Sequence, residues 1–284
     1  MTPGTVSRAV LITGCSSGIG RATALRLAAA GWTVYASARR PETLEELGRA
    51  GCRLLPLDVL DDRSMRAAVE SVVEIEGAVG VLVNNAGYGQ YGAVESVPMD
   101  LVRRQFDTNV LGPARLIQLV LPGMRRQRWG RIVNVSSMGG RLTFPGGGYY
   151  HATKHALEAP TDALRFEVAR FGVHAILVEP GLIRSGFAEA AATTVEETGR
   201  TDDPYAAFNS AVIRITQDTY VNRWLVRFGG TPDDVARTIE RALGSRRPRA
   251  RYRVTTSASL MIAQRRLLPD RLWDRMMRAV FPQP

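Results

Sequence analysis

Lysine is nearly absent from this chain of 284 residues, in which Lys154 is the single lysine among 37 basic side chains. Arginine replaces lysine freely where only surface charge matters, but an ammonium is a compact charge with three donors on a flexible stem, which a planar guanidinium does not reproduce. Position 154 is therefore predicted to require an ammonium. The alternative is that one lysine survived by chance, and the neighbouring residues must decide between the two.

Cysteines and long apolar runs are also scarce. The two cysteines, Cys15 and Cys52, have neither metal-ligand spacing nor a disulfide framework, and each has the alternative role of a small apolar residue. No apolar stretch approaches the roughly 18 residues that span a bilayer. The first residues lack the basic region, apolar run and cleavage site of a signal peptide. We therefore expect a cytoplasmic protein without a metal site.

Acidic residues are too few to balance the arginines, and the net charge is +10. The imbalance is local: residues 246–278 contain ten arginines and two aspartates, whereas the remaining 27 basic and 25 acidic residues nearly cancel. The positive charge thus forms a basic tail on a nearly neutral body, and we expect no nucleic-acid partner.

Short apolar runs alternate with helical patterns up to Pro180. Continuous apolar strands separated by helices are typical of a parallel sheet covered on both faces. The sequence therefore predicts an α/β fold, a single Rossmann-type doubly wound sheet in one domain over residues 1–284. Strands are expected at residues 9–12, 33–37, 54–57, 79–83, 131–135 and 174–178, and helices at 21–30 and 232–243.

The regular alternation stops after Pro180-Gly181. Residues 182–230 mix polar and apolar residues with several aromatics, and an insertion after the carboxyl end of a strand lies where open α/β sheets bind ligands. We interpret 182–230 as a substrate-binding lid and 246–284 as a basic amphipathic tail.

A glycine-rich turn, Thr13–Gly20, separates the first strand from the first helix. Glycines at this place let the backbone approach a pyrophosphate, whose charge the helix N-terminus stabilises. The spacing is G-x-x-x-G-x-G instead of the usual dinucleotide pattern, so its position between strand and helix carries the prediction of a nucleotide site. The expected cofactor contacts are Gly14, Ser16, Ser17, Gly18, Ile19 and Gly20.

The second strand ends in Arg39-Arg40 and has no acidic residue to accept hydrogen bonds from the ribose 2′-OH of NAD. Guanidinium groups suit a 2′-phosphate, and Ser16 adds a hydroxyl, so the sequence predicts NADP(H). Alternatively, both arginines are solvated surface charges. Asp58 and Val59 follow the third strand, where Asp58 is expected either to contact the adenine amino group or to cap a helix.

Polar residues also follow the fourth and fifth strands. Asn85, Ala86 and Gly87 belong to an Asn-Asn-Ala-Gly turn that either braces the nucleotide or is an ordinary turn. Ser137 ends the fifth strand, and Tyr150 precedes Lys154 by four residues, which places both on one helix face. The ammonium is expected to lower the pKa of the tyrosine, unless the pair is an inert surface contact.

These motifs together resemble those of classical short-chain dehydrogenases/reductases. T-G-x-x-x-G-I-G, N-N-A-G, the asparagine at 109, S-x12-Y-x3-K and Pro180-Gly181 occur in the family's order over roughly residues 8–185. The resemblance implies that Tyr150 is the general acid/base, Ser137 polarises the substrate oxygen, Lys154 holds the nicotinamide ribose, and Asn109 holds a water that relays protons. It also implies cofactor contacts from Pro180, Gly181 and, in place of the usual threonine, Ser185.

Several residues depart from this pattern or stay unexplained. Pro160 lies in the expected catalytic helix, where it should kink or loosen the stretch, and because relatives often dimerise through this helix, the expected homo-oligomer is in doubt. Arg141 and the run Gly146–Gly148 border the expected pocket without an assigned role. His151 and His155 lack metal or triad spacing and are interpreted as ordinary helix residues.

The nearest subgroup resemblance is to hydroxysteroid and retinol dehydrogenases, which implies a lipophilic alcohol or ketone. In the tail, Leu272, Met276 and Val280 with Trp273, Met277 and Phe281 form an apolar stripe, and Arg271, Arg275 and Arg278 lie toward the other side. Such a helix can contact an anionic membrane, cover the substrate mouth, or pack against the body or a second subunit, which we favour.

Three functions are consistent with these residues. The first is an NADPH-dependent carbonyl reductase, or alcohol dehydrogenase, for a lipophilic small molecule. The second is a 3-oxoacyl thioester reductase acting with CoA or with an acyl carrier protein, which the basic surface would attract. The third is an NADP(H)-sensing binding protein without turnover, against which the retention of Ser137, Tyr150, Lys154 and Asn109 argues.

Overall fold

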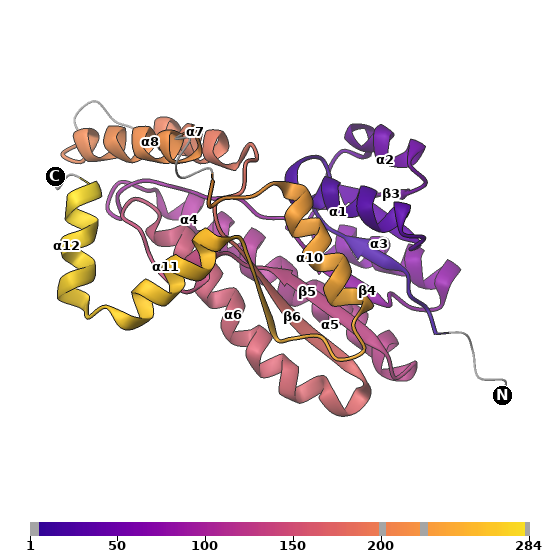
Figure 1. The fold of residues 1–284 in the computed structure, drawn as a ribbon. Coiled ribbons are helices and arrows are strands. Elements are labelled where there is room, and N and C mark those ends of the chain that lie inside the picture. The colour runs from indigo at the N-terminus through magenta and orange to yellow at the C-terminus, as the bar shows by residue number, and fades with distance from the viewer. Residues whose placement is uncertain (1–5, 199–202, 222–226, 282–284) are drawn as a thin grey trace.

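A seven-stranded parallel sheet forms the centre of the computed structural model, which describes residues 6–198, 203–221 and 227–281 (Figure 1). The strand order is β3-β2-β1-β4-β5-β6-β7, so the chain winds outward from β1 in both directions, and the predicted doubly wound fold is confirmed. The strands are β1 Val10–Ile12, β2 Val34–Ala38, β3 Arg53–Pro56, β4 Val81–Asn84, β5 Gly130–Val135, β6 Val173–Pro180 and β7 Arg251–Val254.

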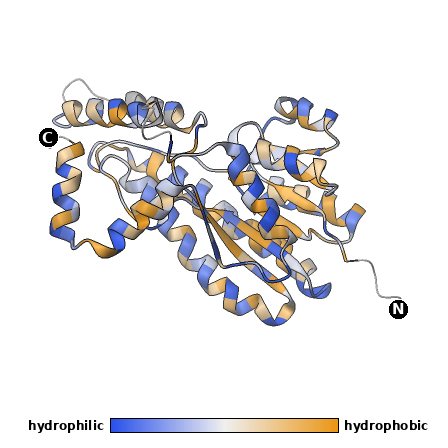
Figure 2. Ribbon diagram, viewed as in Figure 1, coloured by the Kyte–Doolittle hydropathy of each residue, from blue (hydrophilic) through white to orange (hydrophobic). Residues whose placement is uncertain are grey.

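Helices cover both faces of this sheet. Successive strand residues point to opposite faces, so Val10 and Ile12 pack with α1 and α10, whereas Leu11 packs with α3, α5 and α6. Figure 2 shows the inner strands of the sheet in orange, at the hydrophobic end of the scale, whereas the edge strand β7 is hydrophilic. The longer helices are α1 Gly18–Ala29, α2 Glu45–Arg49, α3 Asp62–Glu76, α4 Met99–Phe106, α5 Gly112–Arg126, α6 Gly148–Val168, α7 Phe187–Thr198, α8 Ala206–Val221, α10 Pro232–Gly244, α11 Thr256–Leu267 and α12 Asp270–Val280.

Helix α6 runs unbroken through Pro160. The proline has no N–H to donate to the carbonyl of Ala156, but the residues around it pack well: Leu157 and Leu164 are buried, and Thr161 donates a hydrogen bond to the carbonyl of Leu157. Pro160 therefore does not end the helix, and the kink or loosening expected at this residue stays a prediction.

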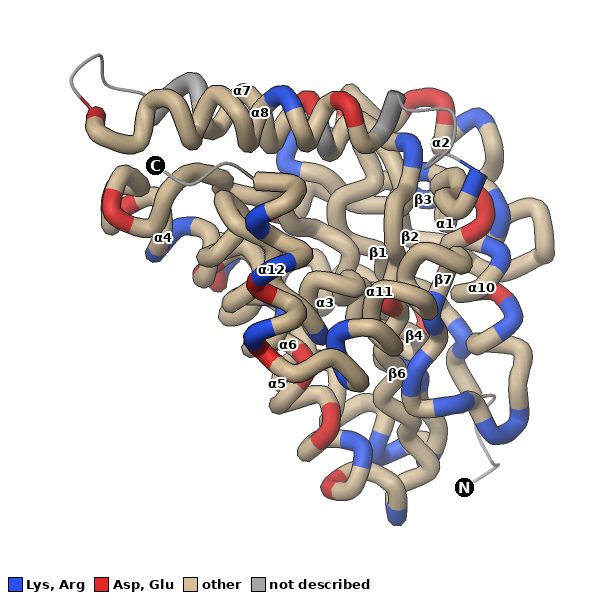
Figure 3. The backbone as a smooth tube through the Cα atoms, turned by 60° about the vertical axis from the view of Figure 1, so that its left-hand side comes forward, with Lys and Arg blue, Asp and Glu red and all other residues tan. Residues whose placement is uncertain are grey.

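The region predicted as a basic tail begins with an edge strand. Residues Arg251–Val254 pair with β6 in parallel as β7, and Arg251 and Arg253 form ion pairs with the fully buried Glu179 of β6. Part of the surplus of arginine in this region therefore lies against a buried acidic group of the body. Figure 3 shows the remaining arginines along the β7 and α10 side and on α12.

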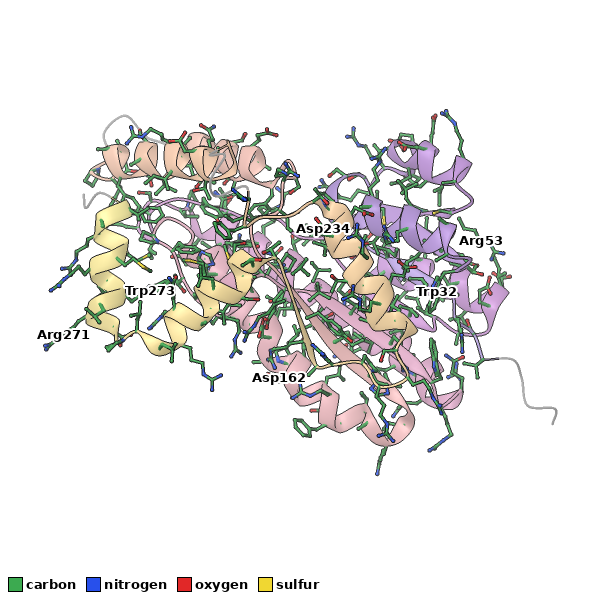
Figure 4. All side chains as sticks on the ribbon, viewed as in Figure 1. Trp32, Arg53, Asp162, Asp234, Arg271 and Trp273 are labelled. Atoms are coloured by element: carbon green, nitrogen blue, oxygen red, sulfur yellow. The ribbon has the colours of Figure 1, made fainter. Side chains whose placement is uncertain are left out.

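The apolar stripe of α12 faces the body. Trp273 and Met277 are buried in a small cluster with Leu142 and Ile262, and in Figure 4 Trp273 points inward whereas Arg271 points away from the protein. This arrangement agrees with the favoured interpretation of the stripe. Leu272 and Val280 stay about half exposed (46% and 51%), and their contact with a membrane remains a prediction.

The described part of the predicted lid contains the helices α7 and α8. α7 and α8 lie side by side above the carboxyl ends of the strands (Figure 1). Of the aromatics expected there, Trp224 and the side chain of Tyr220 lie outside the described residues. Within the ranges that the structure describes, no helix is long and apolar enough to cross a membrane.

Candidate active site

A cavity of about 980 Å³ opens at the carboxyl ends of the strands. One side is formed by the loops that follow β1, β2, β4, β5 and β6, and the other by α7, α8, α11 and α12. The predicted nucleotide loops, the predicted catalytic residues and the lid therefore surround one space, as expected for a ligand at the switch point of a doubly wound sheet.

The glycine turn after β1 is packed against the loop after β4. Gly14 has φ +71°, and a Cβ there would lie 2.9 Å from the Cα of Ala86, so only glycine fits. The hydroxyl of Thr13 accepts hydrogen bonds from the backbone N–H groups of Asn85 (3.0 Å) and Ala86 (2.9 Å). Asn85 Nδ2 donates to the carbonyls of Thr13 and Gly14. Asn85 therefore braces the phosphate-binding turn, and Thr13 is a bracing residue that the sequence reasoning missed.

The N-terminus of α1 opens onto the cavity through Ser16, Ser17, Gly18 and Ile19. Gly18 has φ +57°, and the atom nearest to a Cβ built there is 3.9 Å away, so space is open above the turn. The unpaired N–H groups of a helix start and its dipole favour an anion. These residues fit a dinucleotide pyrophosphate. Gly20 is instead a packing residue, since a Cβ there would lie 2.3 Å from the carbonyl oxygen of Gly14.

The two arginines after β2 separate in the structure. Both are exposed, but Arg39 lines the cavity whereas Arg40 lies outside its lining. The Arg40 carbonyl accepts hydrogen bonds from Thr43. Asp58 and Val59 also line the cavity. Asp58 does not cap a helix: its carboxylate accepts from the N–H of Leu60 (3.0 Å), and Asp61 caps α3.

The predicted catalytic residues meet at the base of the cavity. Tyr150 and Lys154 are both 7% exposed. The Ser137 hydroxyl is near enough to the Tyr150 phenol to lower its pKa, and it accepts a hydrogen bond from the N–H of Gly139 (3.0 Å). Lys154 Nζ donates to the carbonyl of Val135 (2.9 Å) and lies 5.9 Å from the centre of the Tyr150 ring. The serine, the phenol and the ammonium thus lie around one point, where β5 ends against α6.

Burial is the largest cause of the pKa shifts of Tyr150 and Lys154. It raises the pKa of Tyr150 to about 12, and the Ser137 hydroxyl opposes the rise. Burial also lowers the pKa of Lys154 to about 8, against the opposing charge of Glu158. The pKa of Tyr150 therefore lies above its ordinary value and not below it as predicted, because burial disfavours the charged phenolate.

Asn109 lies in a π-helical turn, Asp107–Leu111, a feature often found at functional sites. Its Oδ1 accepts from the N–H of Tyr88 (3.1 Å), and its Nδ2 donates to the carbonyl of Tyr88 (2.9 Å) and to Thr153 Oγ1 (3.0 Å). The side chain therefore joins the loop after β4 to the catalytic helix. The Asn109 side chain makes these three hydrogen bonds to protein groups. Its role in holding a water that relays protons stays a prediction.

Aromatic rings enclose Tyr150. Tyr91 is stacked on it with ring centres 5.9 Å apart, and Phe187 at the start of α7 lies 5.2 Å away. His151 contacts the ring edge-on at 5.4 Å, and burial lowers the pKa of His151 to about 4, so this histidine is neutral. The sequence placed Phe187 only in a lid, and Tyr91 carried no recognisable signal.

Two of the three glycines in the run 146–148 are needed for space. A Cβ on Gly146, which has φ +78°, would lie 2.5 Å from Val212, and one on Gly147 would lie 2.7 Å from His151 Nε2. Gly146 lets α8 pack closely, and Gly147 makes room for the histidine beside Tyr150. These contacts supply the role that the sequence left unassigned.

The loop after β6 completes the cofactor side. Pro180, Gly181 and Ser185 line the cavity as predicted. A Cβ on Gly181 would lie 2.4 Å from Thr255 Oγ1, so this glycine lets the start of α11 approach. On the substrate side, α12 contributes Met276, Met277, Val280 and Phe281 to the cavity wall. The described residues contain no cluster of three metal-ligating side chains.

Comparisons with known proteins agree with this site. The model of the family described as short chain dehydrogenase matches residues 8–196. The chain is 34% identical to a 3-ketodihydrosphingosine reductase of Bacteroides thetaiotaomicron, covering 96% of this chain and 97% of that protein. It is 35% identical to human retinol dehydrogenase 5, covering 97% and 89%. The protein therefore belongs to the short-chain dehydrogenase family.

Solved structures show the same relationship. A short-chain dehydrogenase from Streptomyces avermitilis superimposes with a TM-score of 0.76 at 33% identity and covers 97% of this chain and 96% of its own. Two further neighbours, each 26% identical, were solved with NAD (TM-score 0.77) and with NADP+ (TM-score 0.74). The protein is accordingly an oxidoreductase of a family that uses nicotinamide cofactors.

Proposed function

We propose that the protein is an NADP(H)-dependent oxidoreductase that interconverts a secondary alcohol and a ketone, or an aldehyde, on a lipophilic small molecule. The observation that carries the proposal is the convergence of Ser137, Tyr150 and Lys154 at the base of one cavity. In the direction of reduction, Ser137 and Tyr150 hold the carbonyl oxygen by hydrogen bonds, and Tyr150 gives that oxygen its proton.

A pKa of about 12 keeps Tyr150 protonated at neutral pH, which suits a general acid. The buried Lys154, with a pKa of about 8, brings positive charge to the site and stabilises the phenolate that remains after proton transfer. A reduced nicotinamide, when bound, supplies the hydride to the carbonyl carbon, so the two electrons and the proton of the reduction come from separate donors.

Arg39 supports the choice of NADP(H). Its guanidinium lies at the cavity edge after β2, where the second strand of this fold ends beside the adenosine ribose. The matched test compares Arg39→Ala with Arg40→Ala. We expect Arg39→Ala to raise KM for NADPH about tenfold or more, because a charge-assisted hydrogen bond to the 2′-phosphate is lost. KM for NADH should stay unchanged. Equal effects of the two substitutions, or faster turnover with NADH in the unmodified protein, contradict this choice of cofactor.

The substrate side of the cavity is mostly apolar. Phe144, Ile215, Met261, Met276, Met277, Val280 and Phe281 contribute to its wall, and apolar walls favour an apolar ligand. The names of the relatives, a ketodihydrosphingosine reductase and a retinol dehydrogenase, point to the same class. The 3-oxoacyl thioester reductase is the second candidate, because its substrates also carry an apolar chain next to a ketone.

NADPH oxidation with a panel of lipophilic ketones and 3-oxoacyl thioesters tests these functions. Turnover of the ketones above the thioesters supports the first proposal, and the reverse order supports the second. Tight NADPH binding without turnover of any compound indicates the sensor. Tyr150→Phe is expected to bind NADPH normally and to lose at least a hundredfold in kcat. Full turnover by this variant contradicts the mechanism.

A further inference from the structure

Glu158 is a buried carboxylate that the reaction described above does not use. It lies on α6 one turn after Lys154, and its side chain is 5% exposed. An ionised carboxylate loses several kcal/mol of hydration free energy on burial, which pairing and hydrogen bonds must offset. The partners of Glu158 therefore indicate its role.

The first partner is Ser136, which directly precedes the catalytic serine. Ser136 Oγ donates a hydrogen bond to Glu158 Oε1 (2.9 Å). Gly140 packs directly against this hydrogen bond, since a Cβ there would lie 2.7 Å from Ser136 Oγ and 2.9 Å from Glu158 Oε1. The carboxylate thereby ties the end of β5, which carries Ser137, to the helix that carries Tyr150 and Lys154.

The second oxygen of Glu158 faces arginines from two other elements. Oε2 lies 3.4 Å from Arg141 and 3.3 Å from Arg251 of β7. Arg251 also forms ion pairs with Asp162, one turn further along α6, and with Glu179 of β6 (3.1 Å). Arg141, which had no assigned role in the sequence, is thus a counter-ion of Glu158.

We propose that Glu158 is a positioning residue of the reaction: its carboxylate holds the Ser137 end of β5 against α6 and supplies the negative charge opposite the buried Lys154 ammonium. A residue that only clamped the fold would need neither the hydrogen bond to the residue before Ser137 nor its place one turn from the lysine. The expected effect of Glu158 on turnover rests on the proposed carbonyl chemistry. Its effect on the pKa of Lys154 can be measured without turnover.

The charges around Glu158 fix the direction of that effect. They are Lys154 and Asp162 on α6, Arg141 after β5, Arg251 on β7 and Glu179 on β6. Tyr150, protonated below pH of about 12, adds no charge. Glu158 raises the pKa of Lys154, and burial lowers it to about 8. Neutralising Glu158 leaves the two arginines uncompensated, so the lysine should lose its proton at lower pH.

The decisive variant is Glu158→Gln, whose amide oxygen still accepts from Ser136 but carries no charge. Because Lys154 is the single lysine, the pH dependence of its acetylation by acetic anhydride, followed by peptide mass spectrometry, reports its pKa directly. We expect a midpoint near pH 8 in the unmodified protein and about one pH unit lower in Glu158→Gln. The alkaline limb of kcat for ketone reduction should move with it.

Two further variants separate charge from geometry. Asp162→Asn removes another carboxylate partner of Arg251 from the same helix, two turns beyond Lys154, and should lower the melting temperature while leaving both the labelling midpoint and kcat unchanged. Ser136→Ala keeps the charge of Glu158 but removes the hydrogen bond, and should lower kcat about tenfold without moving the midpoint.

The outcomes distinguish this inference from the proposed function. An unchanged labelling midpoint in Glu158→Gln, or an equal shift in Asp162→Asn, overturns the role of the charge, and full kcat in Ser136→Ala overturns the role of the bond. If Glu158→Gln does not fold, the Ser136→Ala and Asp162→Asn pair still decides the positioning role. If no ketone is turned over but the midpoint shifts as expected, the proposed function fails and the charge coupling stands.

Discussion

Glu179 on β6 should make the stability of the folded protein fall as the pH rises through neutrality. Its side chain is fully buried, and burial, followed by the charge of Glu158, raises its pKa from 4.5 to about 7. Arg251 and Arg253 lie 3.1 and 3.6 Å from its two oxygens. They oppose the rise without cancelling it.

The direction of this pH dependence follows from whether the folded and the unfolded chain bind the Glu179 proton. Between pH 4.5 and pH 7 the unfolded chain has released the Glu179 proton while the folded chain keeps it, so raising the pH favours unfolding. The stabilisation is complete below the unfolded pKa and is lost as the pH passes the folded pKa. At about 1.36 kcal/mol per pH unit, the loss between about pH 5.5 and about pH 8 is about 2 kcal/mol.

Glu179→Gln removes this titration and keeps the side-chain shape. Urea unfolding at several pH values across this range should show the difference in free energy of unfolding between variant and parent change by about 2 kcal/mol. The pKa of His151 is lowered to about 4 by burial, so it also contributes a pH dependence, but one that cancels in the comparison. Asp162→Asn is the control, because its lowered pKa places its titration below this range. A constant difference between Glu179→Gln and the parent refutes the reasoning.

Three further predictions concern the site and its wall. Lys154→Arg should keep its circular dichroism spectrum yet lose at least a hundredfold in kcat, because the guanidinium has a different shape and stays charged; normal turnover would show that the single lysine is chance. Gly147→Ala should lower the free energy of unfolding by about 1–3 kcal/mol through its clash with His151, whereas Gly148→Ala, which meets only Val94 at 3.2 Å, should cost less; equal melting temperatures speak against the clash. Trp273→Ala should lower the free energy of unfolding by about 3–5 kcal/mol and, by loosening α12, raise KM for lipophilic ketones; an unchanged KM would show that substrate binding does not depend on the packing of Trp273.

The sequence predicted the first six strands because their apolar runs are continuous and bounded by glycine or polar turns. The predicted catalytic residues could be placed from their spacing: Ser137 lies two residues after β5, and Tyr150 and Lys154 share a face of α6. β7 was missed because Arg251 and Arg253 make it look like part of a charged tail. Their acidic partners lie far away in the chain, and only the fold brings them together.

Of the properties of the candidate site, the pKa values of its buried groups were the hardest to predict from the sequence. The spacing of Tyr150 and Lys154 indicates attraction between opposite charges but contains nothing about solvent, and burial reversed the expected direction of the tyrosine pKa. The role of Arg39 was separable from that of Arg40 only in three dimensions, because adjacent residues after a strand point in different directions. The wall formed by Phe187, Tyr91 and α12 likewise depends on tertiary contacts that no local pattern encodes.

The burial of the single lysine in α6 has a consequence for proteolysis. A lysine-specific protease has one cleavage site in the chain, after Lys154, and the backbone there is helical and packed in the core. Cleavage therefore requires the chain to open, and under slow cleavage its rate follows the population of the open form. A ligand that binds only the folded state lowers the population of the open form, and with it the cleavage rate, by the factor 1 + [L]/Kd. Cleavage after Lys154 therefore reports the binding of cofactors and substrates without a measurement of turnover.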